Sequence, residues 1–192
     1  MSKLKTNYLN TIKKHILAYA SIRQDIIMQA SDARNHSKRA IFAMQRDDIK
    51  QGETKIRLAE KTLKQLFKKY GKNLRAMNEG VLRDGIEEYV EASLFYQFLT
   101  TGKIGEIKSI LIPEEVYIAG LCDVPGELLR YAIKSATIKD EKMVVACADM
   151  AAEIVSTLSE FDLTKYLRTK FDQANGAVKK IEYIVYELSL KD

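Results

Sequence analysis

The sequence is poor in the residues that interrupt helices or stabilise secreted domains. Only two prolines and nine glycines occur among its 192 residues, and segments that lack them and are rich in strong helix formers favour long helices. Two cysteines are too few for a disulfide framework. No apolar run approaches the ~20 residues of a membrane span, and the first residues lack a signal-peptide core. We therefore expect one reduced, cytoplasmic domain over residues 1–192.

Several kinds of active site are also missing from the sequence. There is no glycine-rich loop of the kind that cradles phosphate groups. The two histidines, His15 and His36, are far apart, so the sequence indicates neither a Cys/His metal cluster nor a nucleophile–histidine pair. Candidate chemistry therefore rests on carboxylates and basic side chains.

Apolar residues recur at steps of three and four almost throughout the chain, which is the period of an amphipathic helix. No window alternates with a period of two. The pattern predicts an all-α bundle of about seven helices. The expected helices cover residues 4–46, 53–70, 80–99, 104–111, 113–136, 140–160, and a last one that begins near 163 or 172 and ends at 190. The predicted inward face of the first helix consists of Ile26, Ala30, Ala33, Ser37, Ile41 and Met44.

Two pairs of acidic residues are the most informative feature. Glu88 and Glu91 are three residues apart on one predicted helix, and Asp123 and Glu127 are four apart on a later one. Like charges at these spacings share a helix face and repel each other. Two such repelling pairs make sense if they face each other around a divalent cation. Ligation by oxygen alone favours Mg²⁺, with Mn²⁺ as the alternative. Solvated helix faces are the alternative explanation of the pattern, with Arg130 forming a surface salt bridge to Glu127.

Basic residues are concentrated on the first predicted helix of a chain whose net charge is +5. Arg39 and Arg46 are expected on one face, and Arg34 and Lys38 on another. Arginine favours bidentate contacts with phosphate. These residues, together with Arg83 just before the first acidic pair, are therefore candidates for binding a nucleic-acid backbone. A solvated helix surface is the alternative interpretation.

Four segments resemble sequences of the translin family. Residues 37–46 are similar to the basic first-helix segment of that family, and residues 178–189 to its C-terminal helix. Residues 88–98 and 123–130 resemble the two acidic motifs of its factor X branch. The segments occur in family order and cover the chain from about residue 20 onward.

This resemblance implies an all-α, translin-like bundle that assembles into a barrel-like octamer around nucleic acid. In the factor X branch it also implies an Mg²⁺-dependent endoribonuclease, in which Glu88, Glu91, Asp123 and Glu127 are the catalytic and metal-binding residues. RNA, single- or double-stranded, is the expected ligand, and single-stranded DNA is a further candidate. The expected partners are other copies of the chain in a homo-octamer, or a translin-like subunit; no membrane partner is expected.

Two features depart from the family pattern. Pro125 lies inside the second acidic motif, where a proline removes a helical hydrogen bond and introduces a kink, so we expect it to affect the placement of Asp123 more than that of Glu127. The chain also lacks a long insertion between the two acidic motifs. It therefore resembles a minimal version of the factor X branch that assembles with itself.

Three functions follow as alternatives. The first is a metal-dependent endoribonuclease subunit with weak sequence preference, since few base-reading features are visible. The second is a translin-like protein that binds RNA or single-stranded DNA without cleaving it, although four carboxylates repel a phosphate backbone unless a metal intervenes. The third is a structural subunit of an oligomer. Metal-dependent cleavage separates the first from the other two, and a salt-dependent gel shift separates the second from the third.

Overall fold

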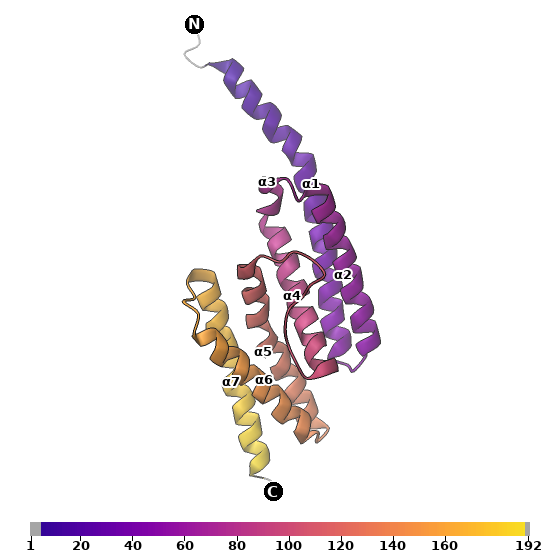
Figure 1. Cartoon of the computed structure of the whole chain (residues 1–192), viewed down its shortest axis with the longest axis vertical. Helices are drawn as coiled ribbons and strands as arrows, with labels where there is room; N and C mark the ends of the chain where they lie inside the picture. The colour runs from indigo at the N-terminus through magenta and orange to yellow at the C-terminus, as the bar shows by residue number, and fades with distance from the viewer. Residues whose placement is uncertain (1–4, 191–192) are drawn as a thin grey trace.

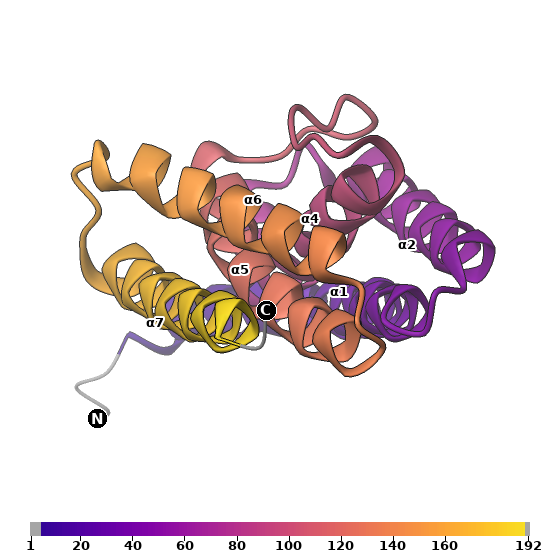
Figure 2. The ribbon, with the colours of Figure 1, turned by 90° about the horizontal axis from the view of Figure 1, so that it is seen from below.

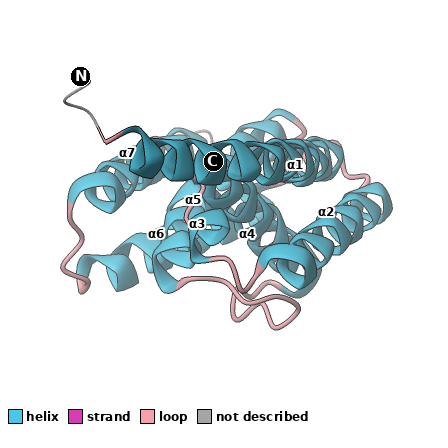
Figure 3. Cartoon of the chain, turned by 90° about the horizontal axis from the view of Figure 1, so that it is seen from above, coloured by secondary structure: helices cyan, strands magenta, loops and turns pink. Residues whose placement is uncertain are grey.

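The computed structural model describes residues 5–190, and the regular secondary structure of that range is entirely helical (Figure 3). The prediction of an all-α bundle of about seven helices is confirmed. Within residues 5–190, no helix combines the length and the apolar character that crossing a membrane requires. The helices are α1 (Thr6–Met44), α2 (Ile49–Tyr70), α3 (Leu74–Met77), α4 (Gly80–Thr101), α5 (Glu114–Thr137), α6 (Glu141–Ser159) and α7 (Lys165–Ser189).

One predicted helix is wrong: residues 104–111 form a loop, and the short α3 takes its place in the count. α4 is terminated by Gly102, which has a positive φ of 68°. Side chains then satisfy the loop backbone without a helix. The Gly105 amide donates to Oε1 of Gln97 at 2.8 Å, and the Tyr117 hydroxyl donates to the Gly105 carbonyl at 3.0 Å. The predicted start of the first helix at Leu4 lies outside the described residues.

The helices are arranged around a central pair, α4 and α5. α1 packs against α2 and α4, whereas α5 packs against α4, α6 and α7 (Figure 1). Viewed from below, α1 and α2 lie on one side of this pair and α6 and α7 on the other (Figure 2). The predicted inward face of α1 is buried from Ile26 to Met44. One hydrophobic core therefore runs through the helices that carry the acidic residues.

Two glycines set how closely α4 approaches its neighbours. A Cβ on Gly85 would stand 2.9 Å from the carbonyl oxygen of Ala30 on α1. A Cβ on Gly120 of α5 would stand 2.8 Å from the carbonyl oxygen of Glu87 on α4. Because close-packed interiors leave no slack for such contacts, any larger residue would push the helices apart. Gly120 therefore brings α5 against α4 at the level of the acidic residues.

A polar contact involving Asp25 ties α1 to the end of α2. Its Oδ2 accepts hydrogen bonds from Lys69 Nζ at 2.7 Å and from the Tyr70 hydroxyl, and its Oδ1 accepts from Gln29. The bond from Lys69, followed by those from Tyr70 and Gln29, lowers the pKa of Asp25 from 3.8 to about 2. Because folding lowers this pKa, the contact stabilises the fold fully above pH about 4, and the stabilisation is lost as the pH falls towards 2.

We expect Asp25→Asn to lower the free energy of unfolding by about 1 kcal/mol at pH 7. This figure is discounted for solvent screening, since the Asp25 side chain is 24% exposed. The difference from the unsubstituted chain should shrink steadily between pH 4 and pH 2, as measured by urea unfolding across that range. Asp32→Asn, at an exposed position of the same helix, should show no such pH-dependent difference. A loss that stays constant down to pH 2 would contradict the electrostatic explanation.

Candidate metal and nucleic-acid site

Five carboxylates lie where α4 and α5 meet. Glu87, Glu88 and Glu91 belong to α4, and Asp123 and Glu127 belong to α5. Each predicted acidic pair therefore shares one helix, as the spacing indicated. α5 continues through Pro125 without interruption, and Asp123 remains within the cluster.

Glu91 is the most deeply buried of these carboxylates, with 9% of its surface exposed. It lies on the same helix as the core residues Phe95 and Phe98, whose apolar face continues beyond it. Burial raises the pKa of Glu91 well above its ordinary value, and the negative charges of Asp123 and the other carboxylates raise it further, opposed by Lys170. No hydrogen bond or ion pair joins the Glu91 side chain to another of residues 5–190. Since an unpaired buried carboxylate is energetically costly, a cation would bind most favourably beside Glu91.

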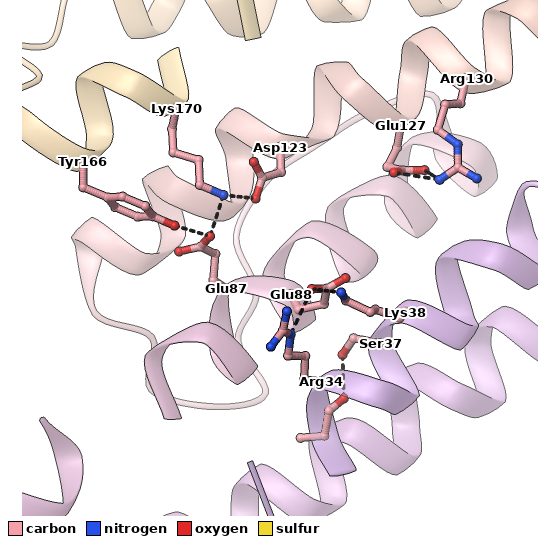
Figure 4. A network of polar contacts seen from close by, with 11 residues as sticks. Arg34, Ser37, Lys38, Glu87, Glu88, Asp123, Glu127, Arg130, Tyr166 and Lys170 are labelled. Carbon is pink, nitrogen blue, oxygen red and sulfur yellow. Dashed lines mark hydrogen bonds and ion pairs between the residues drawn. The ribbon is translucent and has the colours of Figure 1, made fainter. Parts of the chain in front are cut away.

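Glu88 faces two basic residues of α1 (Figure 4). Its Oε2 lies 3.7 Å from Arg34 Nε and 3.7 Å from Lys38 Nζ. Burial raises the pKa of Glu88, and the charges of Lys38 and Arg34 oppose that rise. The side chains of Arg34 and Lys38 are 45% and 43% exposed, so they line the solvent side of the cluster.

A lysine of α7 reaches into the other side of the cluster (Figure 4). Lys170 Nζ lies 2.6 Å from Asp123 Oδ2 and 2.7 Å from Glu87 Oε1, and the Tyr166 hydroxyl donates to Glu87 at 2.8 Å. Burial alone lowers the pKa of Lys170, but its bonds with Asp123 and Glu87 outweigh this and raise it. Lys170 therefore stays protonated and acts as the internal counter-ion of both carboxylates.

Glu127 has one partner on its own helix and one in the turn that follows α1. Its Oε2 lies 3.0 Å from Arg130 Nη1 and accepts a hydrogen bond from Gln45 Nε2 at 2.8 Å. The Arg130 contact is the salt bridge that the alternative interpretation of this motif predicted. The side chain of Glu127 is only 14% exposed, however, and Lys134, one turn further on, pairs with Asp47 instead. The second acidic motif is therefore part of the half-buried cluster and not a solvated helix face.

The carboxylate oxygens of the cluster are suitable ligands for a hard divalent cation, but their present positions do not form a binding site. Within residues 5–190, no group of three or more His, Cys, Asp or Glu side chains is placed so that it could hold a metal ion. The reason is that Glu88, Asp123 and Glu127 each turn to a different basic side chain (Figure 4). All the available donors are carboxylate oxygens, the ligands that Mg²⁺ and Mn²⁺ prefer, and Glu91 is unpartnered within the described part of the chain. Metal binding would require Glu88 and Glu127 to exchange their present partners for the ion.

Of the predicted basic residues, two belong to this cluster and the others are exposed elsewhere on the structure. Arg34 and Lys38 join the cluster through Glu88, whereas Arg83 pairs with Glu115 at 3.0 Å. Arg39 lies exposed on α1. The expectation that Arg39 and Arg46 share a helix face is wrong, because α1 ends at Met44 and Arg46 belongs to the turn that follows.

Sequence reasoning missed three residues of the cluster: Glu87, Tyr166 and Lys170. Glu87 adjoins Glu88 in the sequence and was a visible candidate. Lys170 follows Asp123 by 47 residues, and no local spacing relates the two. Only the packing of α7 against α5 brings them together.

Comparison with known proteins gives consistent matches. The model of the Translin family matches residues 21–192. A translin-associated protein X homolog of Schizosaccharomyces pombe is 22% identical over 189 residues, covering 88% of this chain and 82% of that protein. An uncharacterised protein of Methanocaldococcus jannaschii is 27% identical over 178 residues, covering 90% and 78%.

Solved structures with the same fold include two C3PO proteins. The crystal structure of apo-NeC3PO has a TM-score of 0.82 at 21% identity, covering 97% of this chain and 98% of that one. The structure of the AfC3PO–duplex RNA complex has a TM-score of 0.83 at 19% identity, covering 96% and 97%. At these identities the likeness establishes the helical fold.

Proposed function

This chain belongs to the translin family, and we propose that it is a metal-dependent endoribonuclease subunit that binds and cleaves RNA inside a hollow oligomer. The observation that carries the proposal is Glu91, a buried carboxylate without a partner among residues 5–190, with three further predicted acidic residues near it. The structural likeness to AfC3PO, which has been solved with duplex RNA, supports RNA as the ligand.

In this proposal Glu88, Glu91 and Glu127, helped by Asp123, hold one or two Mg²⁺ ions, or Mn²⁺ in their place. Bound there, such an ion would supply a water of lowered pKa and stabilise the charge that develops on the phosphate. Glu91 forms no ion pair within residues 5–190, and only the charge of Lys170 opposes the rise of its pKa, so a bound cation would favour its ionised form.

The basic residues beside the cluster would hold the RNA backbone. Arg34 and Lys38 stand at its solvent side, and a phosphate is the natural replacement partner for their charges once Glu88 has turned to the metal. Arg39, Arg46 and Arg83 have exposed side chains, and we propose them for more distant phosphates of the same strand. Contacts of this kind fix the position of a strand without reading its sequence.

A second candidate is a translin-like protein that binds RNA or single-stranded DNA without cleaving it. The observation in its favour is that Glu88, Asp123 and Glu127 each already have a basic partner from the protein itself. A cluster neutralised in this way repels phosphate less than four free carboxylates would.

Incubating the purified chain with labelled RNA separates the two candidates. With Mg²⁺ or Mn²⁺ we expect RNA fragments, because the ion completes the acidic cluster. In excess chelator we expect a gel shift without fragments, and the shift should weaken steeply with added salt because phosphate contacts carry the affinity. A salt-sensitive shift with intact RNA in both metals would favour the non-catalytic binder and contradict the nuclease.

A further inference from the structure

The first part of α1 extends beyond the helical bundle (Figure 1). Every residue from 5 to 18 is exposed, and the buried part of the helix begins at Tyr19. The projecting part, residues 6–18, is roughly 20 Å long at the α-helical rise, and we call it the arm. Isolated helices of this length are marginal in water, so a helical arm without packing partners indicates a surface that becomes covered.

The arm carries an apolar stripe that continues the buried face of α1. Tyr8, Leu9, Ile12 and Ile16 fall within about 100° of one another on the helix, and Tyr19 lies in the same sector. Tyr8 is 70% exposed and Ile16 is 53% exposed. The same face of α1 is therefore buried in the core from Tyr19 onward and exposed to solvent before it.

A separate apolar groove lies between the loop that follows α4 and the start of α5. Its volume is about 570 Å³, within the range of sites that enclose several large apolar groups. Leu111 is 86% exposed and Phe161 is 48% exposed at its surface. The apolar side chains that line it include Ile107, Ile110, Leu111, Ile112, Tyr117 and Phe161.

The charges of the two surfaces are complementary. The arm and its flanks carry Lys5, Lys13 and Lys14, and no acidic residue precedes Asp25 in the sequence. Two acidic residues and no basic residue line the groove: Glu106 pairs with Lys108 of the same loop at 3.4 Å, whereas Glu114 forms no ion pair within residues 5–190. An amphipathic helix laid into an apolar groove is a common mode of protein–protein recognition. Opposite charges at the rim favour this pairing over the pairing of two surfaces that carry the same charge.

The arm cannot reach the groove of its own chain. α1 is one continuous helix from Thr6 to Met44. The views from below and from above both place the arm on the opposite side of the bundle from the loop that follows α4 (Figure 2, Figure 3). We therefore propose that the arm of one copy docks into the groove of a second copy, so that the contact links chains head to tail. This inference shares with the proposed function only the expectation of self-association, and it does not depend on RNA cleavage.

Two charge-matched variants test whether the arm carries the assembly. Ile12→Asp with Ile16→Asp places two negative charges in the stripe, and light scattering should show the mass of the oligomer falling at least twofold towards the 21.9 kDa of one chain. Asn10→Asp with Thr11→Asp adds the same charges to the other face of the arm and should leave the mass unchanged. Equal masses for the two variants would overturn the proposal. So would loss of RNA binding by the stripe variant with its mass intact, since the arm would then serve RNA.

Cross-linking between mixed chains tests the groove independently of any effect on folding. A chain carrying Ile12→Cys is mixed with one carrying Leu111→Cys and treated with a short bismaleimide. The native Cys122 and Cys147 are buried, and burial raises the pKa of each thiol to about 12, so neither competes. We expect a covalent dimer in the mixture that neither chain gives alone. A dimer from the Ile12→Cys chain alone would show pairing between arms and would overturn docking in the groove.

Discussion

Replacing Glu91 by glutamine is expected to abolish metal-dependent RNA cleavage and to leave the fold at least as stable as before. Glutamine keeps the shape of the side chain and removes the charge that a metal ion needs. Groups that only support metal ligands typically contribute 10–100-fold to activity, so loss of a ligand should lower the rate by more than about a hundredfold. The fold should not suffer, because Glu91 is 9% exposed and has no partner to lose among residues 5–190.

Cleavage rate and melting temperature, measured on the same preparation, check this result. Glu53→Gln is the matched control, since it makes the same chemical change on α2, where the Glu53 side chain is 39% exposed and pairs only with Arg57 of the same helix, and it should cleave normally. Full activity of the Glu91→Gln variant would remove Glu91 from the site. A large fall in its melting temperature would show that Glu91 has a structural partner instead.

Replacing Lys170 by methionine is expected to have the largest effect on stability. The substitution keeps most of the side-chain length but leaves Asp123 and Glu87 without their shared counter-ion. Breaking a buried ion pair costs about 3–5 kcal/mol; we expect about 3 kcal/mol, the low end, because the Lys170 side chain is 16% exposed. In a chain of this size that lowers the melting temperature by roughly 6–12 °C.

The variant should also respond to metal more strongly than the unsubstituted chain does. A divalent cation replaces part of the missing positive charge. Added Mg²⁺ should therefore raise the melting temperature of Lys170→Met more than it raises that of the unsubstituted chain. Lys170→Arg keeps the charge and should be close to normal, and Lys179→Met, at an exposed position of α7, controls for loss of a lysine. Instability that Mg²⁺ does not relieve would assign Lys170 a packing role only.

Periodicity in the sequence was sufficient to predict the long helices and their inward faces. On the last helix Val178 and Ile181 are buried, Val185 and Leu188 are partly buried, and Tyr183 and Tyr186 are exposed. The same periodicity failed over residues 104–111. There, apolar residues at helical spacing pack on the core from a loop, because Gly102 ends α4 and side chains of neighbouring helices satisfy the loop backbone.

The candidate site was predictable in its acidic residues and not in its basic partners. Spacing placed Glu88 with Glu91 and Asp123 with Glu127, since neighbours at three or four residues share a helix face. Which cation each carboxylate meets depends on how helices pack, and that depends on close contacts such as Gly120 against α4. The contact between Lys170 and Asp123 is a product of that packing and leaves no local signal in the sequence.

Calorimetric titration of Mn²⁺ into the RNA-free chain tests most directly whether the carboxylates around Glu91 hold a divalent cation. We expect at least one ion per chain for the unsubstituted protein and for Glu53→Gln, and loss of that binding in Glu91→Gln. Equal uptake by the unsubstituted chain and Glu91→Gln, or no uptake by either, would contradict this expectation.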